Sequence, residues 1–509
     1  MIFNLFTSKH WHVGKMCAIW IAIFPLCSNA SPYAGPSFQL KEFPSVITDP
    51  LWAFPASLTE NTPSASNVLP ADCSMQWVGA SPLSLGAAVD IALCNNLQIK
   101  AAWAQIKLQA SQLGQAKAAY LPSLSLAVNK LRTTTHYPDA PDYMEADSTV
   151  EGYTAYASLN WRIFDFGGRT ANKHAADAML SAAFAQRDAS IQKTLHTVVG
   201  AFFDALAADH ALAARQQATK LAQDTYESTL RRERKGVVAR NDSLQAATAL
   251  AKAQLAQQRA SGEKTKALTA LSYALGLAPQ TALRLQQDGY SAEASHTMDD
   301  LSSWLRAAQA QHPAIVAAKL QWTAAQEKVV VARSEGRPTL ELTGSYAKNG
   351  YPNQGLQANR TQTTTIGLTL NIPLFEGFAR TYKVQEAQAQ AQQSLLQMQD
   401  VEHQTLGEVV KAYADAQAAL LNLTASQTLL QAAQQIVSSS RKRYLDGAAD
   451  ILELLSSLNA LTEAQQERIH CIAEWNSARL RLWASAGNLS KNELTEMKSP
   501  NTNKSAGEN

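Results

Sequence analysis

Apolar and polar residues alternate strictly in four short stretches of this 509-residue chain. The stretches "YTAYASLNWRI" (153–163) and "TIGLTLNI" (365–372) are apolar at every second position, and "PSLSLAVN" (122–129) and "PTLELTGS" (338–345) repeat the pattern. A period of two is typical of a β-strand with one apolar and one polar face. We therefore predict strands over residues 122–132, 153–163, 338–348 and 362–372.

Two long tracts without proline predict long helices. No proline lies between residues 170 and 278 or between residues 374 and 499, and both tracts are rich in the helix formers Ala, Gln, Leu, Lys and Arg. From Thr170 to Lys235 the only glycine is Gly200. A continuous helix there would measure about 100 Å at about 1.5 Å per residue. Such a length indicates a helical bundle or coiled coil.

The chain is a duplication. Four pairs of residues share an offset of 211, namely Phe164 with Phe375, Arg169 with Arg380, Gly236 with Gly447, and Gly276 with Gly487. Upstream, Pro122 and Pro338 differ by 216. We expect the five extra residues in the tip loop of the first strand hairpin, between Lys130 and Tyr153. The repeats, 83–279 and 300–489, would each read helix, strand, tip loop, strand, long helix, glycine turn, long helix.

Strands of about ten residues match the length that spans a membrane in a tilted β-barrel. Four strands cannot close a barrel, and lipid does not tolerate open sheet edges. Two copies would give eight strands with a filled interior, whereas three copies give twelve strands and room for a water-filled lumen. The alternative is a soluble sandwich, which would leave the long helices without packing partners.

The stretches "FDFGGR" (164–169) and "FEGFAR" (375–380) join a strand to a long helix in each repeat. We expect Gly167, Gly168 and Gly377 to tolerate the turn at these joints. Phe164 and Phe375 are expected near the lipid–water boundary.

The chain begins with a pattern typical of a secretory signal over residues 1–30: Lys9 and Lys15, an apolar core, and a small-x-small cleavage site at its end. Lipidation at Cys27 is not expected, because Leu26 stands where a small residue should precede the cysteine. Residues 31–82 form an irregular leader rich in Pro and Ser, and residues 490–509 a polar tail predicted to be disordered.

After removal of the signal the chain keeps three cysteines. Cys73 and Cys94 could form a disulfide across about 20 residues, worth about 3 kcal/mol; the alternative is two buried thiols. Cys471 lies in a helical tract, and we expect it to be a small core residue.

The formal net charge of +2 argues against a nucleic-acid partner. The ten histidines are scattered, and zinc-protease, nucleophile-elbow and phosphate-loop motifs are absent, so neither an enzyme nor a cofactor or metal site is expected. A surface adhesin or structural coiled coil would explain the helices but not four membrane-length strands.

These features together resemble the TolC family of outer-membrane efflux proteins. The resemblance rests on the duplicated units, the joints "LNWRIFDFGGR" and "LNIPLFEGFAR", and an acidic residue six positions after each glycine turn, and it covers residues 83–489. The opening "PLSLGAAVDIALCNNLQIKAAWA" (82–104), with Cys73 upstream, resembles the branch that contains the CyaE proteins of type I secretion.

The resemblance implies a homotrimer with a twelve-stranded β-barrel in the outer membrane and a twelve-helix tunnel in the periplasm. Its partners would be a periplasmic adaptor (membrane fusion) protein and an inner-membrane ABC exporter or proton-driven pump. The adaptor would contact the helix-turn tips: Arg234, Lys235, Gly236, Asp446 and Gly447. The cargo would be a protein, as in type I secretion of toxins, or, alternatively, small molecules or drugs.

In the family an acid narrows the periplasmic mouth and matches Glu453 here; three copies would form a negative ring. A tyrosine and a basic residue on the second turn meet an acid on the first, and Tyr444 and Asp242 match two of these. The basic position holds Ala449, which departs from the pattern, so Arg441 or Arg443 substitutes or the closed state is weaker. Alternatively, Glu453 is a solvated helix residue and Asp242 a capping acid.

Overall fold

The computed structural model describes residues 49–54, 82–136, 147–286, 300–349 and 361–487. All of them belong to the larger of two structural units, residues 49–509. The expected signal peptide, Cys27, Cys73, most of the leader and the expected disordered tail lie outside the described residues, so these predictions stay untested.

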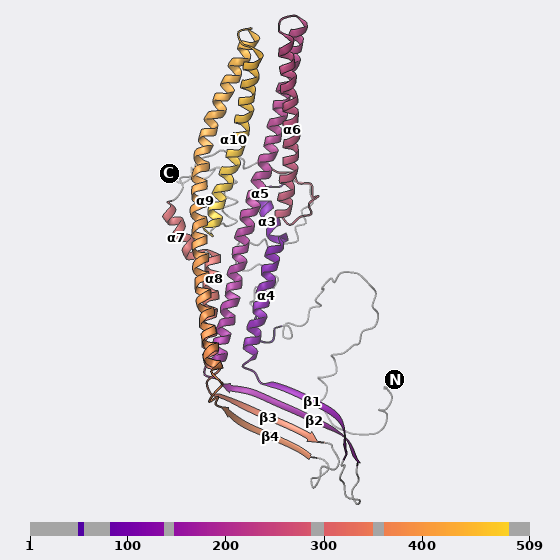
Figure 1. Cartoon of the computed structure of the whole chain (residues 1–509), viewed down its shortest axis with the longest axis vertical. Coiled ribbons are helices and arrows are strands. Elements are labelled where there is room, and N and C mark those ends of the chain that lie inside the picture. Colours follow the sequence, from indigo (N-terminus) through magenta and orange to yellow (C-terminus); the bar gives the residue numbers. More distant parts are fainter. Residues whose placement is uncertain (1–48, 55–81, 137–146, 287–299, 350–360, 488–509) are drawn as a thin grey trace, which may run out of the picture. The chain divides into compact units, whose positions relative to one another are not determined.

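Both repeats contain the same elements in the same order (Figure 1). The first repeat comprises α3 (Leu85–Asn95), α4 (Leu97–Ala118), β1 (Ser123–His136), β2 (Asp147–Phe164), α5 (Gly168–Arg234) and α6 (Arg240–Ala274). The second comprises α7 (Leu301–Gln311), α8 (Pro313–Ser334), β3 (Thr339–Asn349), β4 (Thr361–Asn371), α9 (Ala379–Leu445) and α10 (Ile451–Ser485). The helices that precede the strands, α7 and α8, start and end 216 residues after α3 and α4. The helices that follow the strands, α9 and α10, start and end 211 residues after α5 and α6.

The four strands form one antiparallel sheet in the order β1-β2-β3-β4. The ladder of β1 and β2 runs from Ser123 opposite Asn160 to His136 opposite Asp147, so β1 has 14 residues where β3 has 11. The prediction that the extra residues form a tip loop is therefore wrong. They lie in the predicted interval, but they lengthen the paired strands, because the alternating, β-branched sequence there continues the ladder.

One face of this sheet is apolar, and no helix among the described residues covers it. Its apolar side chains include Leu124, Leu126 and Val128 of β1 and Ile366, Leu368 and Leu370 of β4, all of them exposed. A soluble sandwich would pack such a face into a core. The outer edges of β1 and β4 also lack a paired strand among the described residues.

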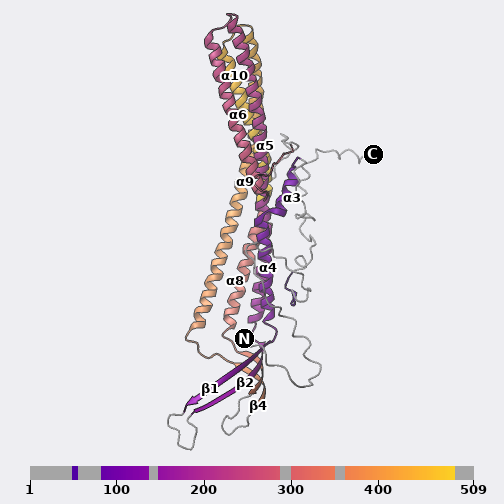
Figure 2. The same ribbon diagram turned by 90° about the vertical axis from the view of Figure 1, so that its right-hand side faces the viewer.

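The long helices pack side by side, with the glycine turns at one end and the strands at the other (Figures 1 and 2). Helix α5 packs against α4, α6, α8 and α10, and α9 packs against α7, α8 and α10. The short helices α3 and α7 lie against α5 and α9, where larger apolar side chains gather. One cluster contains Val198, Phe202 and Leu206 of α5, and the other contains Trp304 of α7 and Trp475 of α10.

Helix α5 is the one described helix long and apolar enough to cross a membrane by length and composition alone. Its largest apolar side chains, however, are buried against α3 and α10 in the protein core. Cys471 is buried and is not in a disulfide, as expected of a small core residue. Cys94 is buried and in a disulfide, but its pairing with Cys73 stays a prediction because Cys73 is outside the described residues.

Candidate functional site

At the strand-to-helix joints the chain turns from strand into helix through two consecutive left-handed residues. In the first joint these are Phe166 and Gly167, with φ of 51° and 90°, and in the second Gly377 and Phe378, with φ of 59° and 64°. Glycine and phenylalanine thus exchange places between the repeats, and each phenylalanine bears the steric cost of this region. Gly168, which we expected to serve the turn, is not left-handed; a Cβ there would collide with the Ser334 side chain.

Arg169 stabilises the first joint by linking the end of β2 to the start of α5. Its backbone N–H and Nε donate to Asp165 Oδ2 at 2.9 and 3.0 Å, and its Nη2 donates to the carbonyl of Ile163 at 3.0 Å. The guanidinium lies 4.9 Å from the centre of the Tyr120 ring. The Arg169 and Asp165 side chains are only 12% and 13% exposed, so the end of β2 is held firmly to the start of α5.

In the second joint the equivalent arginine makes fewer and longer contacts. Arg380 corresponds to Arg169, but its Nη2 lies 3.8 Å from Glu376, and its Nε has no hydrogen-bond partner in the described chain. Gly336 stands where the first repeat has Tyr120, and the Arg380 guanidinium occupies the space of the missing side chain. Phe164 and Phe375 are exposed at these joints, as a position at the lipid–water boundary would require.

At the opposite end, each pair of long helices is joined by a turn around a left-handed glycine, Gly236 with φ 72° and Gly447 with φ 75°. Arg234, Lys235 and Asp446 are exposed beside these glycines. The expected tip residues are therefore accessible to a partner protein.

Tyr444 ties the two helix hairpins together. Its side chain is buried, and its hydroxyl lies 3.2 Å from Thr229 Oγ1 of α5. Arg232 of α5 donates from Nη1 to the Tyr444 carbonyl at 3.0 Å and stacks 4.8 Å from the ring centre. Within this chain the tyrosine therefore meets Thr229 and Arg232, whereas the family pattern led us to expect Asp242.

Glu453 is not a bare acid. Arg443 Nη1 donates to Glu453 Oε1 at 2.8 Å, and Ser440 Oγ donates to the same oxygen at 3.3 Å. Of the two arginines considered as substitutes for the basic residue missing at Ala449, Arg443 is the one that contacts an acid. That acid belongs to its own hairpin, and Asp450, which caps α10 by accepting from the Glu453 N–H at 2.8 Å, completes the arrangement.

Asp242 lies in the first turn of α6, where the helix dipole favours a carboxylate. It is not the cap of α6: that position is Ala239, which gives no side-chain hydrogen bond. Among the described residues the Asp242 carboxylate makes no ion pair. Sequence reasoning missed Thr229, Arg232 and Ser440 at the tip, although Arg232 and Arg443 share the 211-residue offset.

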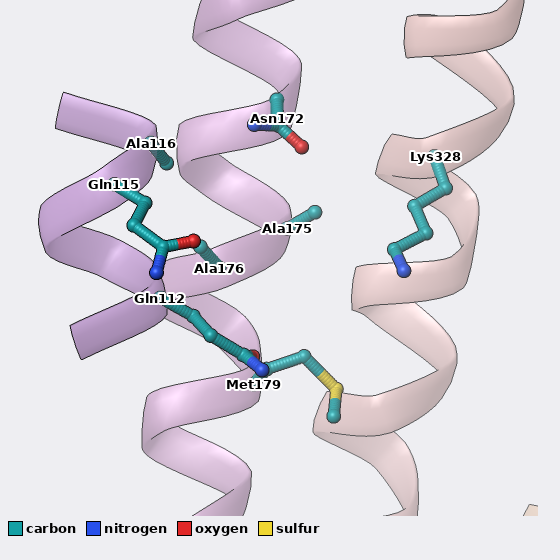
Figure 3. A pocket seen from close by; sticks show the side chains of 8 residues that line it. All are labelled: Gln112, Gln115, Ala116, Asn172, Ala175, Ala176, Met179 and Lys328. Atoms are coloured by element: carbon teal, nitrogen blue, oxygen red, sulfur yellow. The ribbon is translucent and has the colours of Figure 1, made fainter. Parts of the chain in front are cut away.

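An open hollow of about 260 Å³ lies between α4, α5 and α8 (Figure 3). It is lined by Gln112, Gln115, Ala116, Asn172, Ala175, Ala176, Met179 and Lys328. Amides with one lysine offer neither a nucleophile–base pair nor a carboxylate pair. The described residues also hold no group of three His, Cys, Asp or Glu side chains placed to bind a metal.

Comparisons with known proteins agree with this architecture. The model of the outer membrane efflux protein family matches residues 88–277 and 304–488. The chain is 33% identical to Protein CyaE of Bordetella pertussis over 81% of this chain and 85% of that protein. It is 24% identical to the alkaline protease secretion protein AprF of Pseudomonas aeruginosa over 79% and 84%. A crystal structure of CusC superposes with a TM-score of 0.69 at 18% identity, covering 79% of this chain and 91% of that one.

Proposed function

This chain belongs to the outer membrane efflux protein family, and we propose that three copies form a passive exit duct through the outer membrane and periplasm. In this proposal the twelve strands of the trimer close a barrel in the outer membrane. The α4, α5, α8 and α9 helices continue it as a periplasmic tunnel, and the α5–α6 and α9–α10 turns form its inner mouth.

The exposed apolar face of the sheet carries this proposal. Leu124, Ile366 and Leu368 are between 63% and 79% exposed on a face that no described helix covers. Their exposure costs free energy in water, at about 25 cal/mol per Å² of apolar surface, but not in lipid. The free edges of β1 and β4 need partner strands there, and further copies of the same chain supply them by symmetry.

The proposed partners follow from the two ends of the duct. Outer-membrane lipid would surround the sheet, and a periplasmic adaptor would contact the exposed tips at Arg234, Lys235 and Asp446. An inner-membrane ABC exporter, or alternatively a proton-driven pump, would supply the energy for export. Export of the chain itself would use the signal over residues 1–30.

Type I protein secretion is the favoured cargo route. It is supported by the similarity to CyaE over most of both chains and by AprF, whose name states that it serves secretion of a protease. The alternative is the efflux of small toxic molecules, since a tunnel of this kind accepts what its inner-membrane partner delivers.

Deletion of the coding sequence in the native host tests the proposal. Loss of one secreted protein from the medium, its retention in the cells and unchanged drug sensitivity are expected for type I secretion. Raised drug sensitivity with normal secretion would instead favour small-molecule efflux. If neither secretion nor drug sensitivity changed, the proposed duct would have no support.

A further inference from the structure

The duplication places an arginine and an acidic residue at matching positions of both helix tips. Arg232 and Arg443 are 211 residues apart, and so are Asp242 and Glu453. In each hairpin the arginine precedes the glycine of the turn, and the acid lies six residues after that glycine. Helices α5 and α9 end, and α6 and α10 begin, at matching positions. The positions of these residues would therefore allow an arginine–acid ion pair across the turn in both hairpins.

Only the second hairpin makes this pair. Arg443 Nη1 lies 2.8 Å from Glu453 Oε1, and Arg443 Nη2 also donates to the Ala448 carbonyl at 3.3 Å, which fixes the guanidinium over the turn. The Arg443 and Glu453 side chains are 53% and 38% exposed, so the pair lies at the surface of the tip.

In the first hairpin the arginine is engaged elsewhere. Arg232 stacks on Tyr444 and donates to its carbonyl. The residue of the first repeat equivalent to Tyr444 is Glu233. Arg443 therefore has no matching tyrosine in the first hairpin on which to stack. Asp242 is consequently left without an ion pair among the described residues.

We infer that Arg443 is a specificity-determining residue of the periplasmic mouth: it compensates the charge of Glu453, so that Asp242 is the acid that sets the preference for cations. This inference rests on the proposed duct, since it requires the tip to line a water-filled passage. It reverses the assignment that the family pattern gives, in which the acid at position 453 carries the negative field.

Ion selectivity in planar bilayers tests the inference. The K⁺ to Cl⁻ permeability ratio of purified protein is obtained from the reversal potential in a KCl gradient. Arg443→Gln should raise this ratio about threefold or more, because an uncompensated charge lining a narrow passage strongly raises the local counter-ion concentration. Asp242→Asn should lower it.

A double-mutant cycle isolates the pair. Glu453→Gln alone should lower the ratio by leaving Arg443 uncompensated, whereas Arg443→Gln with Glu453→Gln should return it to the wild-type value. Arg441→Gln is the matched control: it removes the same charge from a side chain that makes no ion pair among the described residues. Its effect should be the same whether position 453 is Glu or Gln. Arg443→Lys should restore much of the wild-type ratio.

Two failures are distinguishable. If Glu453→Gln changes the ratio equally with and without Arg443, or if Asp242→Asn has no effect while channels still conduct, the inference is wrong and the duct stands. If trimers of normal yield and heat resistance conduct no ions at all, the proposed duct fails.

Discussion

At the scale of single residues, the two strand–helix joints differ most in their arginines. Arg169→Gln removes a nearly buried ion pair, a bond to a strand carbonyl and the stacking on Tyr120. We expect it to lower the free energy of unfolding by about 2–3 kcal/mol. Arg380→Gln should cost less than about 1 kcal/mol, because its pair with Glu376 is long and half exposed. Guanidinium denaturation of the detergent-solubilised protein measures the free energy of unfolding of both variants. Equal losses of stability would mean that Arg169 does not stabilise its joint more than Arg380 does.

His312 gives a prediction about pH. Burial lowers the pKa of this imidazole, whose Nδ1 accepts the Ala314 N–H as the cap of α8. The folded state therefore binds a proton less readily than the unfolded state, and stability is lost as the pH falls from about 6.5 towards the lowered pKa.

The equivalent residue of the first repeat, Asn96, caps α4 in the same way and does not titrate in this range. His312→Asn should therefore keep the cap and reduce the loss of stability between pH 7.5 and pH 5. The pKa of His196 is also lowered, by burial and by Arg481, so His196 accounts for the pH-dependent loss of stability that remains in the variant. The denaturation midpoint is measured at pH 7.5 and at pH 5 for both proteins. If it falls by the same amount in the wild type and in the variant, His312 does not have this role.

At the scale of elements, Tyr444 links the two helix hairpins. Tyr444→Phe loses only the contact with Thr229, about 1 kcal/mol, whereas Tyr444→Ala also loses the buried ring, about 3–5 kcal/mol. We expect channel conductance to rise slightly in the first and strongly in the second. Leu445→Ala, which truncates an exposed neighbour, should have little effect. No graded increase would mean that this contact does not hold the mouth.

The sheet gives a second prediction at this scale. Ile366 is on the exposed apolar face of β4, and Thr365 is on the opposite face. Ile366→Arg should cost about 2–4 kcal/mol if this face meets the middle of the membrane, whereas Thr365→Arg on the other face should cost much less. The yield of heat-resistant trimers in outer-membrane fractions measures the difference. Equal yields would mean that lipid does not contact Ile366.

The strands were readable from their period of two, and the long helices from their tracts without proline. The prediction of one helix before the strands of each repeat was wrong: the chain forms two there, α3 and α4 in the first repeat and α7 and α8 in the second. The offsets of 211 and 216 residues recur at every helix end. The interpretation of the extra residues as a loop was wrong, since pattern alone does not show where pairing stops. The partners at the tip were beyond sequence reasoning, because Arg232 contacts Tyr444, a residue more than 200 positions away. Arg232 has the same spacing from Asp242 as Arg443 has from Glu453, but only Arg443 forms an ion pair with its acid.

At the scale of the whole molecule, one chain carries an unclosed four-stranded sheet with an exposed apolar face. Lipid tolerates such a face but not open sheet edges, so in the proposed duct the additional strands would come from other copies of the chain. The mass of the detergent-solubilised particle, measured by light scattering on material that is then inserted into a planar bilayer, tests this most directly. We predict three copies of the chain and a conducting channel. A single chain that stays soluble without detergent and conducts no ions would overturn the proposed trimeric duct.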